Sequence, residues 1–90
     1  MAQIKVERAT EERLAELQTD RWSSWECGVE TFDWEYAADE VAYVKEGKVT
    51  VEPVDGEAVT FGAGDIVWFP RGMRCRWIVH QPIRKVFRLG

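Results

Sequence analysis

The stretches FDWEYAADEVAYVKEGKV (residues 32–49) and GAGDIVWFPRGMRCRW (residues 62–77) decide the fold of this chain. Both alternate short apolar runs with glycines. Gly47, Gly64 and Gly72 fall where tight turns between strands need a positive φ or a close approach of two backbones. The two stretches therefore predict a succession of short strands joined by tight turns.

Turn-forming residues divide the rest of the chain after Trp22 in the same way. Asp55-Gly56, between two apolar runs, predicts a hairpin with a two-residue loop. Short strands at regular spacing, with no alternation of strands and helices, predict an all-β antiparallel sandwich or barrel. The expected strands cover approximately residues 29–34, 40–45, 48–54, 57–61, 66–69, 74–79 and 83–89.

One short helix is expected near the N-terminus. Alternating apolar and charged residues over 4–7 are typical of a short half-buried strand. Thr10 then suits an N-cap, and Leu14 and Leu17 lie on one face of a helix over residues 11–18. A helix of this length is not stable alone, so it must pack against the rest of the domain.

Length and charge limit the classes of function. Ninety residues form one domain, which we expect to span 1–90, with the N-terminal strand and helix at 1–21 and a barrel core at 22–90. Sixteen acidic and 12 basic residues give a net charge of −4, which argues against nucleic acid and anionic membranes as partners. The sequence shows neither a signal pattern nor an apolar run of roughly 18 residues that would span a membrane. We therefore expect a cytoplasmic protein.

Cysteine spacing and the basic residues near the C-terminus carry little functional signal. Cys27 and Cys75 lack a CxxC spacing, so two reduced thiols are expected. Six basic residues in the last twenty positions are interpreted as solvated strand faces. They are Arg71, Arg74, Arg76, Arg84, Lys85 and Arg88.

The spacing of the two stretches resembles the two motifs of the cupin family, over roughly residues 20–90. Among cupins, the chain most resembles the (S)-ureidoglycine aminohydrolase-like subgroup. The resemblance implies an all-β cupin barrel, a double-stranded β-helix or jelly roll, with one short N-terminal helix and a homodimeric assembly. The first motif reads Gly28, five residues, Trp34-Glu35-Tyr36, three residues, Glu40, six residues and Gly47; the second reads Gly64, five residues, Pro70-Arg71-Gly72, two residues and Cys75.

The same resemblance implies a divalent metal held by three imidazoles and one carboxylate. In this chain Trp34, Tyr36 and Cys75 occupy slots that are usually histidine, and only Glu40 keeps its ligand identity. Trp34 cannot bind a metal, and Tyr36 is a poor ligand unless deprotonated, which leaves Glu40 and Cys75 as weak candidates. The single histidine, His80, should point to the face opposite Cys75, because residues alternate faces along a strand. We predict no metal or other cofactor.

A pocket without a metal is the predicted site. Trp34 and Tyr36 point the same way along one strand, and Cys75 and Trp77 along another, so their side chains should meet Glu40 inside the barrel. Such an aromatic-lined pocket suits a small planar or sugar-like ligand, with the Tyr36 hydroxyl and the Glu40 carboxylate as polar contacts. A buried Glu40 needs a partner such as that hydroxyl or a ligand cation, or is protonated and able to act in acid–base catalysis. The alternative for Glu40 is a solvated position at the rim.

Three functions remain open on these grounds. The leading hypothesis is a cupin that binds a small molecule in the pocket formed by these five side chains. The resemblance implies an alternative, an enzyme on small nitrogenous metabolites such as ureides, with Glu40 as the candidate catalytic residue. The third is a structural module with a filled barrel, which dimerises through a face that includes Trp22 and Trp25.

Overall fold

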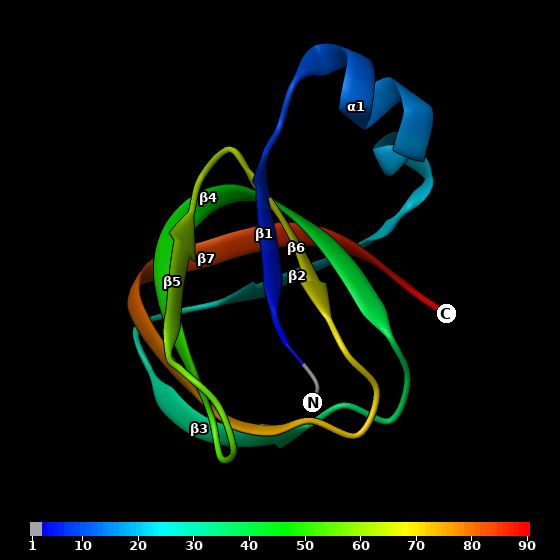
Figure 1. Cartoon of the computed structure of the whole chain (residues 1–90). Coiled ribbons are helices and arrows are strands. Elements are labelled where there is room, and N and C mark those ends of the chain that lie inside the picture. Colours follow the sequence, from blue (N-terminus) through cyan, green and yellow to red (C-terminus); the bar gives the residue numbers. More distant parts are fainter. Residues whose placement is uncertain (1–2) are drawn as a thin grey trace.

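Two long, curved strands form the centre of the fold in this computed structural model, which describes residues 3–90. These strands, β4 and β7, pair with each other, and each carries two short strands on its other side. All pairs are antiparallel, and Figure 1 shows the sheet curling into a barrel. The predicted all-β barrel is therefore confirmed. The strands are β1 (Lys5–Arg8), β2 (Ser23–Cys27), β3 (Thr31–Glu35), β4 (Glu40–Pro53), β5 (Val59–Gly62), β6 (Asp65–Phe69) and β7 (Arg74–Leu89).

A bulged segment bends the two long strands at mid-length. The register between β4 and β7 shifts three times between Val44 and Val49. Gly47 lies in this segment with a φ of 103°, and a Cβ there would collide with the carbonyl oxygen of Pro82. Bulges bend a strand and increase its twist. The first half of β4 therefore pairs with β6, and the second half pairs with β5.

The bulge explains two wrong predictions of strand ends. The expected strands broke at residues 46–47 and 80–82, but β4 and β7 each run through as one strand that includes Gly47 and Pro82 respectively. The hydrogen bonds between β4 and β7 continue on both sides of the bulged segment, so neither Gly47 nor Pro82 ends the pairing of the two strands. The predicted two-residue loop at Asp55-Gly56 was also wrong. The last pair of the β4–β5 hairpin is Val51–Val59, so the connecting loop is longer. Beyond that last pair, Glu52 pairs instead with β7.

The short helix α1 (Glu11–Leu17) lies outside the barrel, beside one end of it (Figure 1). Its start is as predicted: the Thr10 hydroxyl accepts a hydrogen bond from the Arg13 amide at 3.1 Å. The Arg13 guanidinium lies 5.8 Å from the ring centre of Trp68 in β6, which ties the helix to the barrel. A 3-10 turn, η1 (Thr19–Arg21), leads into β2.

β1 pairs with β6, so the N-terminal strand predicted within residues 1–21 belongs to the barrel sheet. The first two residues of that range, Met1 and Ala2, lie outside the described residues. Within the part of the chain that is described, no helix has both the length and the apolar character needed to cross a membrane.

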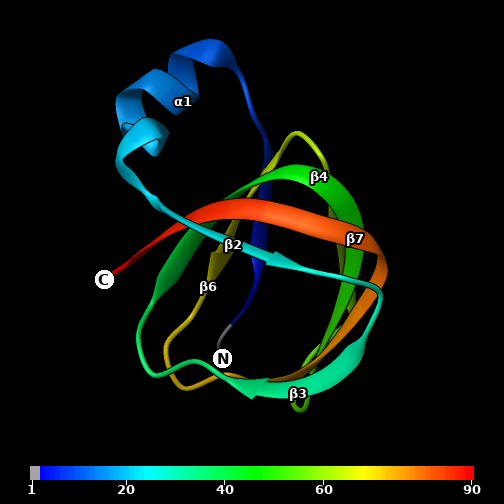
Figure 2. The ribbon, with the colours of Figure 1, turned by 180° about the vertical axis from the view of Figure 1, so that it is seen from behind.

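The barrel interior has two regions of different composition. Near β4 and β5, side chains that are at most 2% exposed fill the space: Val44, Val49, Val51, Phe61, Val79 and Ile83. Aromatic rings dominate the region bounded by β2, β3 and β7, the strands nearest the viewer in Figure 2. The strand β2 was not predicted, and its pairing with β7 places Trp25 beside the second region.

Candidate ligand-binding cavity

A cavity of about 320 Å³ opens into the aromatic region of the barrel. This volume lies at the lower end of the roughly 300–1,000 Å³ that is usual for ligand pockets. Strands β2, β3, β4 and β7 all contribute side chains to its wall. The lining residues are Trp25, Phe32, Trp34, Tyr36, Glu40, Trp77, Lys85, Phe87 and Leu89.

A buried ion pair forms the polar part of this wall. Lys85 Nζ lies 2.6 Å from Glu40 Oε2, and the two side chains are 7% and 9% exposed. Ala42, the next inward residue after Glu40 on β4, belongs to the buried core. Carboxylates are almost never this buried without a partner. The partner of Glu40 is Lys85 and not the expected Tyr36 hydroxyl, and the alternative of a solvated rim position was wrong.

Four aromatic rings surround the Lys85 ammonium. The distances from Nζ to the ring centres are 5.0 Å for Trp77, 5.1 Å for Trp25, 5.4 Å for Phe87 and 5.6 Å for Phe69. The negative faces of aromatic rings attract cations at such distances. Burial lowers the pKa of Lys85, and the Glu40 carboxylate opposes that shift. The rings and Glu40 together hold a positive charge away from water.

Tyr36 presents a protonated hydroxyl to the cavity. Its ring stacks on Phe69 at 4.9 Å, and its oxygen accepts a hydrogen bond from Trp77 Nε1 at 3.2 Å. Burial, with a smaller contribution from the Glu40 charge, raises the pKa of Tyr36 far above its usual range. Within residues 3–90, no side chain or backbone group accepts the hydroxyl proton. That proton is available to a ligand.

Trp34 and Cys75 differ from the other three predicted site residues. Trp34 lines the cavity but is 53% exposed, so its indole forms part of the mouth. Cys75 is buried, does not line the cavity, and donates its thiol to the Trp34 carbonyl at 3.6 Å. Burial, and secondarily the charge of Asp33, raise the pKa of Cys75 to about 11. Cys75 is therefore an unreactive core thiol at neutral pH.

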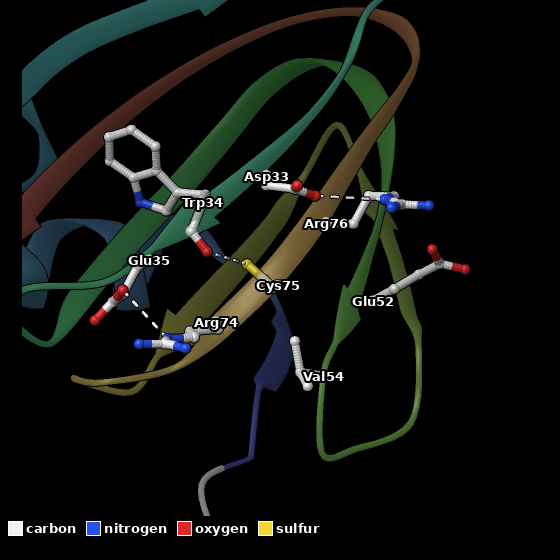
Figure 3. A pocket seen from close by; sticks show the side chains of 8 residues that line it. All are labelled: Asp33, Trp34, Glu35, Glu52, Val54, Arg74, Cys75 and Arg76. Carbon is white, nitrogen blue, oxygen red and sulfur yellow. Dashed lines mark hydrogen bonds and ion pairs between the residues drawn. The ribbon is translucent and has the colours of Figure 1, made fainter.

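The outer surface of β3 and β7 carries a broader, charged groove of about 580 Å³ (Figure 3). Arg76 pairs with Asp33 at 3.4 Å and Arg74 with Glu35 at 3.3 Å across the two strands. Glu52 lines the same groove and has no ion pair among the described residues, so the groove is open to water and carries a net negative charge. His80 also faces outward, as predicted, and its Nε2 lies 2.7 Å from the Thr50 hydroxyl.

The donor groups do not fit a divalent metal. Glu40 already bonds to the Lys85 ammonium, and the Cys75 thiol points at a backbone carbonyl. Across residues 3–90, no three His, Cys, Asp or Glu side chains lie where they could hold an ion together. The positive charge beside Glu40 belongs to Lys85.

Sequence reasoning missed Lys85, Trp25, Phe32 and Phe87 as parts of the site. The interpretation of Lys85 as part of a solvated strand face was wrong, because its side chain points into the barrel. A signal was present: Lys85 alternates in phase with Ile83 and Phe87, two apolar residues of the inward face. A lysine in that phase indicates a buried partner.

Comparison with known proteins places the fold in a family. Residues 14–87 match the model of the EutQ-like cupin domain. A DUF861 family protein from Thermotoga maritima is 44% identical, with a TM-score of 0.95 over 98% of this chain and 100% of that chain. No match was found among curated proteins.

More distant structures share the fold. The EutQ protein of Clostridium difficile is 24% identical, with a TM-score of 0.65, 96% of this chain covered and 66% of that chain. A protein of unknown function from Rhizobium leguminosarum is 22% identical, with a TM-score of 0.62 and coverages of 90% and 93%. The predicted cupin family is confirmed: this chain belongs to the EutQ-like cupin domain family.

Proposed function

We propose that this cupin binds an uncharged, largely planar small molecule in the barrel cavity without using a metal. The observation that carries the proposal is an aromatic-walled cavity whose two charged groups, Glu40 and Lys85, neutralise each other at 2.6 Å. An ionic ligand would have to separate this pair in a site of low polarity, whereas a neutral ligand leaves it intact.

The cavity walls suit such a ligand in two ways. Phe32 and Trp77 stack on each other with centres 5.9 Å apart, and Trp25 meets Trp77 edge-on at the same distance. Flat aromatic surfaces stack planar groups and exclude water. The Tyr36 hydroxyl then provides one hydrogen-bond donor that fixes the orientation of a carbonyl or ether oxygen.

The five tryptophans allow a test with internal controls. Trp25, Trp34 and Trp77 line the cavity, whereas Trp22 and Trp68 do not. Indole N–H resonances, assigned with single Trp→Phe variants, are followed by NMR during titration with neutral single-ring fragments and matched carboxylates. We expect saturable shifts at the three cavity indoles with the neutral fragments only. Shifts confined to Trp22 and Trp68, or none at millimolar fragment, contradict the proposal.

Trp34→Ala provides a variant that should fold normally, because this side chain is already 53% exposed. Losing one stacking surface of about 0.5–1.5 kcal/mol should weaken fragment binding roughly two- to tenfold. The matched control is Val54→Ala, which removes an exposed apolar side chain (73%) from outside the cavity. Equal affinities for both variants and the wild type would place the ligand elsewhere.

Absence of a metal is part of the proposal and has its own test. Protein purified without chelators or metal-affinity resin should contain far less than one equivalent of Mn, Fe, Ni, Cu or Zn by mass spectrometry. Supporting this, Glu40 is held by Lys85 and Cys75 by a backbone carbonyl. A near-stoichiometric metal that is lost in Glu40→Gln would overturn the proposal that the site works without a metal.

A second candidate function is an enzyme on small nitrogenous metabolites such as ureides, the activity implied by the subgroup resemblance. It is favoured by one observation, a buried carboxylate on the wall of a ligand-sized cavity. Ureides should then be hydrolysed by the wild type and not by Glu40→Gln. Full activity in that variant would remove the role of Glu40.

The homodimer remains a prediction. Trp25 is half-buried and packs against Trp77 and Phe32 on the cavity wall, so only part of its ring is free for a dimer face. The cavity also argues against a filled barrel with a purely structural role. Sedimentation at high protein concentration tests the dimer directly, and a strictly monomeric species contradicts it.

A further inference from the structure

The geometry points to Lys85 as a carbonyl-reactive amine: we propose that its Nζ forms an imine with a small aldehyde or ketone held in the cavity. The inference rests on the proposed function, because it requires a neutral ligand in the same cavity. It adds the chemical class of that ligand and a covalent step.

The position of Lys85 separates it from the other lysines of the chain. Lys5, Lys45 and Lys48 are exposed, whereas the Lys85 side chain is 7% exposed and lines the cavity. Lysines in apolar pockets are the ones that proteins use to form imines, because desolvation favours the neutral, nucleophilic amine. The lowering of the pKa of Lys85 by burial agrees with this.

Glu40 lies where a proton carrier is needed, 2.6 Å from Nζ. Its carboxylate takes a proton from the ammonium, and the freed lone pair attacks the carbonyl carbon while the carbonyl oxygen takes the proton from Glu40. Glu40 then removes a second proton from nitrogen and passes it to the hydroxyl, which leaves as water. The C–O bond breaks as the C=N bond forms. One ammonium and one carbonyl compound give one protonated imine and one water, so charge is conserved and no oxidant or reductant is needed.

The surroundings stabilise both ends of this reaction. The protonated imine keeps its positive charge at the place where four ring centres lie 5.0–5.6 Å from Nζ. The Tyr36 hydroxyl, whose oxygen is held by Trp77 Nε1, has a proton to donate to the carbonyl oxygen. The cavity of about 320 Å³ limits the compound to about one ring or a short chain.

Reductive trapping tests the inference on the intact wild-type chain. The protein is incubated with benzaldehyde, and separately with cyclohexanone, in the presence of cyanoborohydride, which reduces an imine to a stable secondary amine. Intact mass gives the number of adducts, and chymotryptic peptides give their positions. We expect initial labelling of Lys85 at least tenfold faster than of Lys45 or Lys48, which are controls in the same molecule.

Two variants sharpen the test. Lys85→Arg keeps a cation beside Glu40 but removes the amine at position 85. The total labelling of the chain should therefore fall to that of the exposed lysines alone. Glu40→Gln keeps the side-chain shape but cannot carry the proton, and should slow labelling at position 85 at least tenfold. Should either variant fail to fold, the comparison of Lys85 with the exposed lysines in the wild type still decides the question.

The outcomes separate this inference from the proposed function. Cavity indole shifts with benzaldehyde, together with labelling of Lys85 no faster than of Lys45 and Lys48, overturn the imine and leave ligand binding standing. If neither the cavity indole shifts nor the preferential labelling of Lys85 is observed, both the imine and the proposed ligand binding are overturned. Preferential labelling of Lys85 that is blocked by a non-carbonyl fragment of the same shape supports both.

Discussion

The inner and outer faces of β7 carry the same kind of charge pair in opposite surroundings. On the outer face, Arg76–Asp33 and Arg74–Glu35 lie 3.3–3.4 Å apart with side chains 58–82% exposed (Figure 3). On the inner face, Lys85–Glu40 lies 2.6 Å apart with side chains under 10% exposed. The outer pairs are screened by water and are worth little. The inner pair is costly to bury.

Burial in water-free surroundings distinguishes the inner charge pair from the outer pairs. Apolar pairs of similar volume often replace buried ion pairs with no loss of stability, so stability alone is a weak reason for Lys85 and Glu40. They lie instead on the wall of the cavity, whereas the outer pairs line a groove that is open to water.

The largest effect is expected when the inner pair is broken on one side. Lys85→Met leaves the Glu40 carboxylate buried without a partner, which should lower the free energy of unfolding by about 3–5 kcal/mol at pH 7. Urea denaturation measures the change. A loss below about 1 kcal/mol would mean that water reaches Glu40 and that the pair resembles the outer ones.

Replacing both partners should recover most of that loss. The double variant Lys85→Met/Glu40→Leu removes both charges, so its stability should return to within about 1 kcal/mol of the wild type or exceed it. The same denaturation experiment completes a double-mutant cycle. We expect reductive trapping at position 85 to be lost even though the fold is retained. A double variant as unstable as Lys85→Met would assign the pair a structural role.

The buried Cys75 thiol should make the stability of the fold depend on pH. The pKa of Cys75 is raised from 9.0 to about 11, so between these values the unfolded thiol loses its proton and the folded thiol keeps it. Stability from this group is complete below pH 9 and should fall by at most about 2–3 kcal/mol as pH rises to 11. Urea denaturation from pH 8 to 11 measures the slope.

Cys75→Ala should flatten that slope relative to the wild type, while Cys27→Ala serves as the control for a half-buried thiol. Comparing slopes avoids the separate cost of the small cavity that Cys75→Ala creates. Equal slopes in all three proteins would show that the Cys75 thiol is accessible to water in the folded state.

The smallest effect is expected on the outer face. Arg76→Ala removes one exposed partner and should change the free energy of unfolding by less than about 1 kcal/mol, and this change should shrink as the salt concentration rises. Fragment binding in the cavity should stay unchanged, because Arg76 does not line it. A loss as large as that of Lys85→Met would abolish the contrast between the two faces.

Much of the fold could be read from local sequence. Thr10 at the helix start was correctly placed because capping depends on neighbours within one turn. Inward and outward positions, such as Trp77 and His80, followed from alternation along one strand. The continuation of β4 through Gly47 and of β7 through Pro82 was not predictable in this way, because the pairing with partner strands carries each strand through a residue that would otherwise end it.

The sequence by itself determined the antiparallel barrel, and its resemblance to cupins implied that Trp34, Tyr36 and Cys75 stand where histidine ligands are usual. Only the tertiary structure decided that Lys85, 45 residues after Glu40, is its partner at 2.6 Å. The same holds for Trp25 from the unpredicted strand β2, which closes the cavity wall. The physical reason is the distance along the chain over which each effect acts. Strand alternation and turn preferences act over a few residues. A buried charge is satisfied by whichever distant strand the sheet brings beside it.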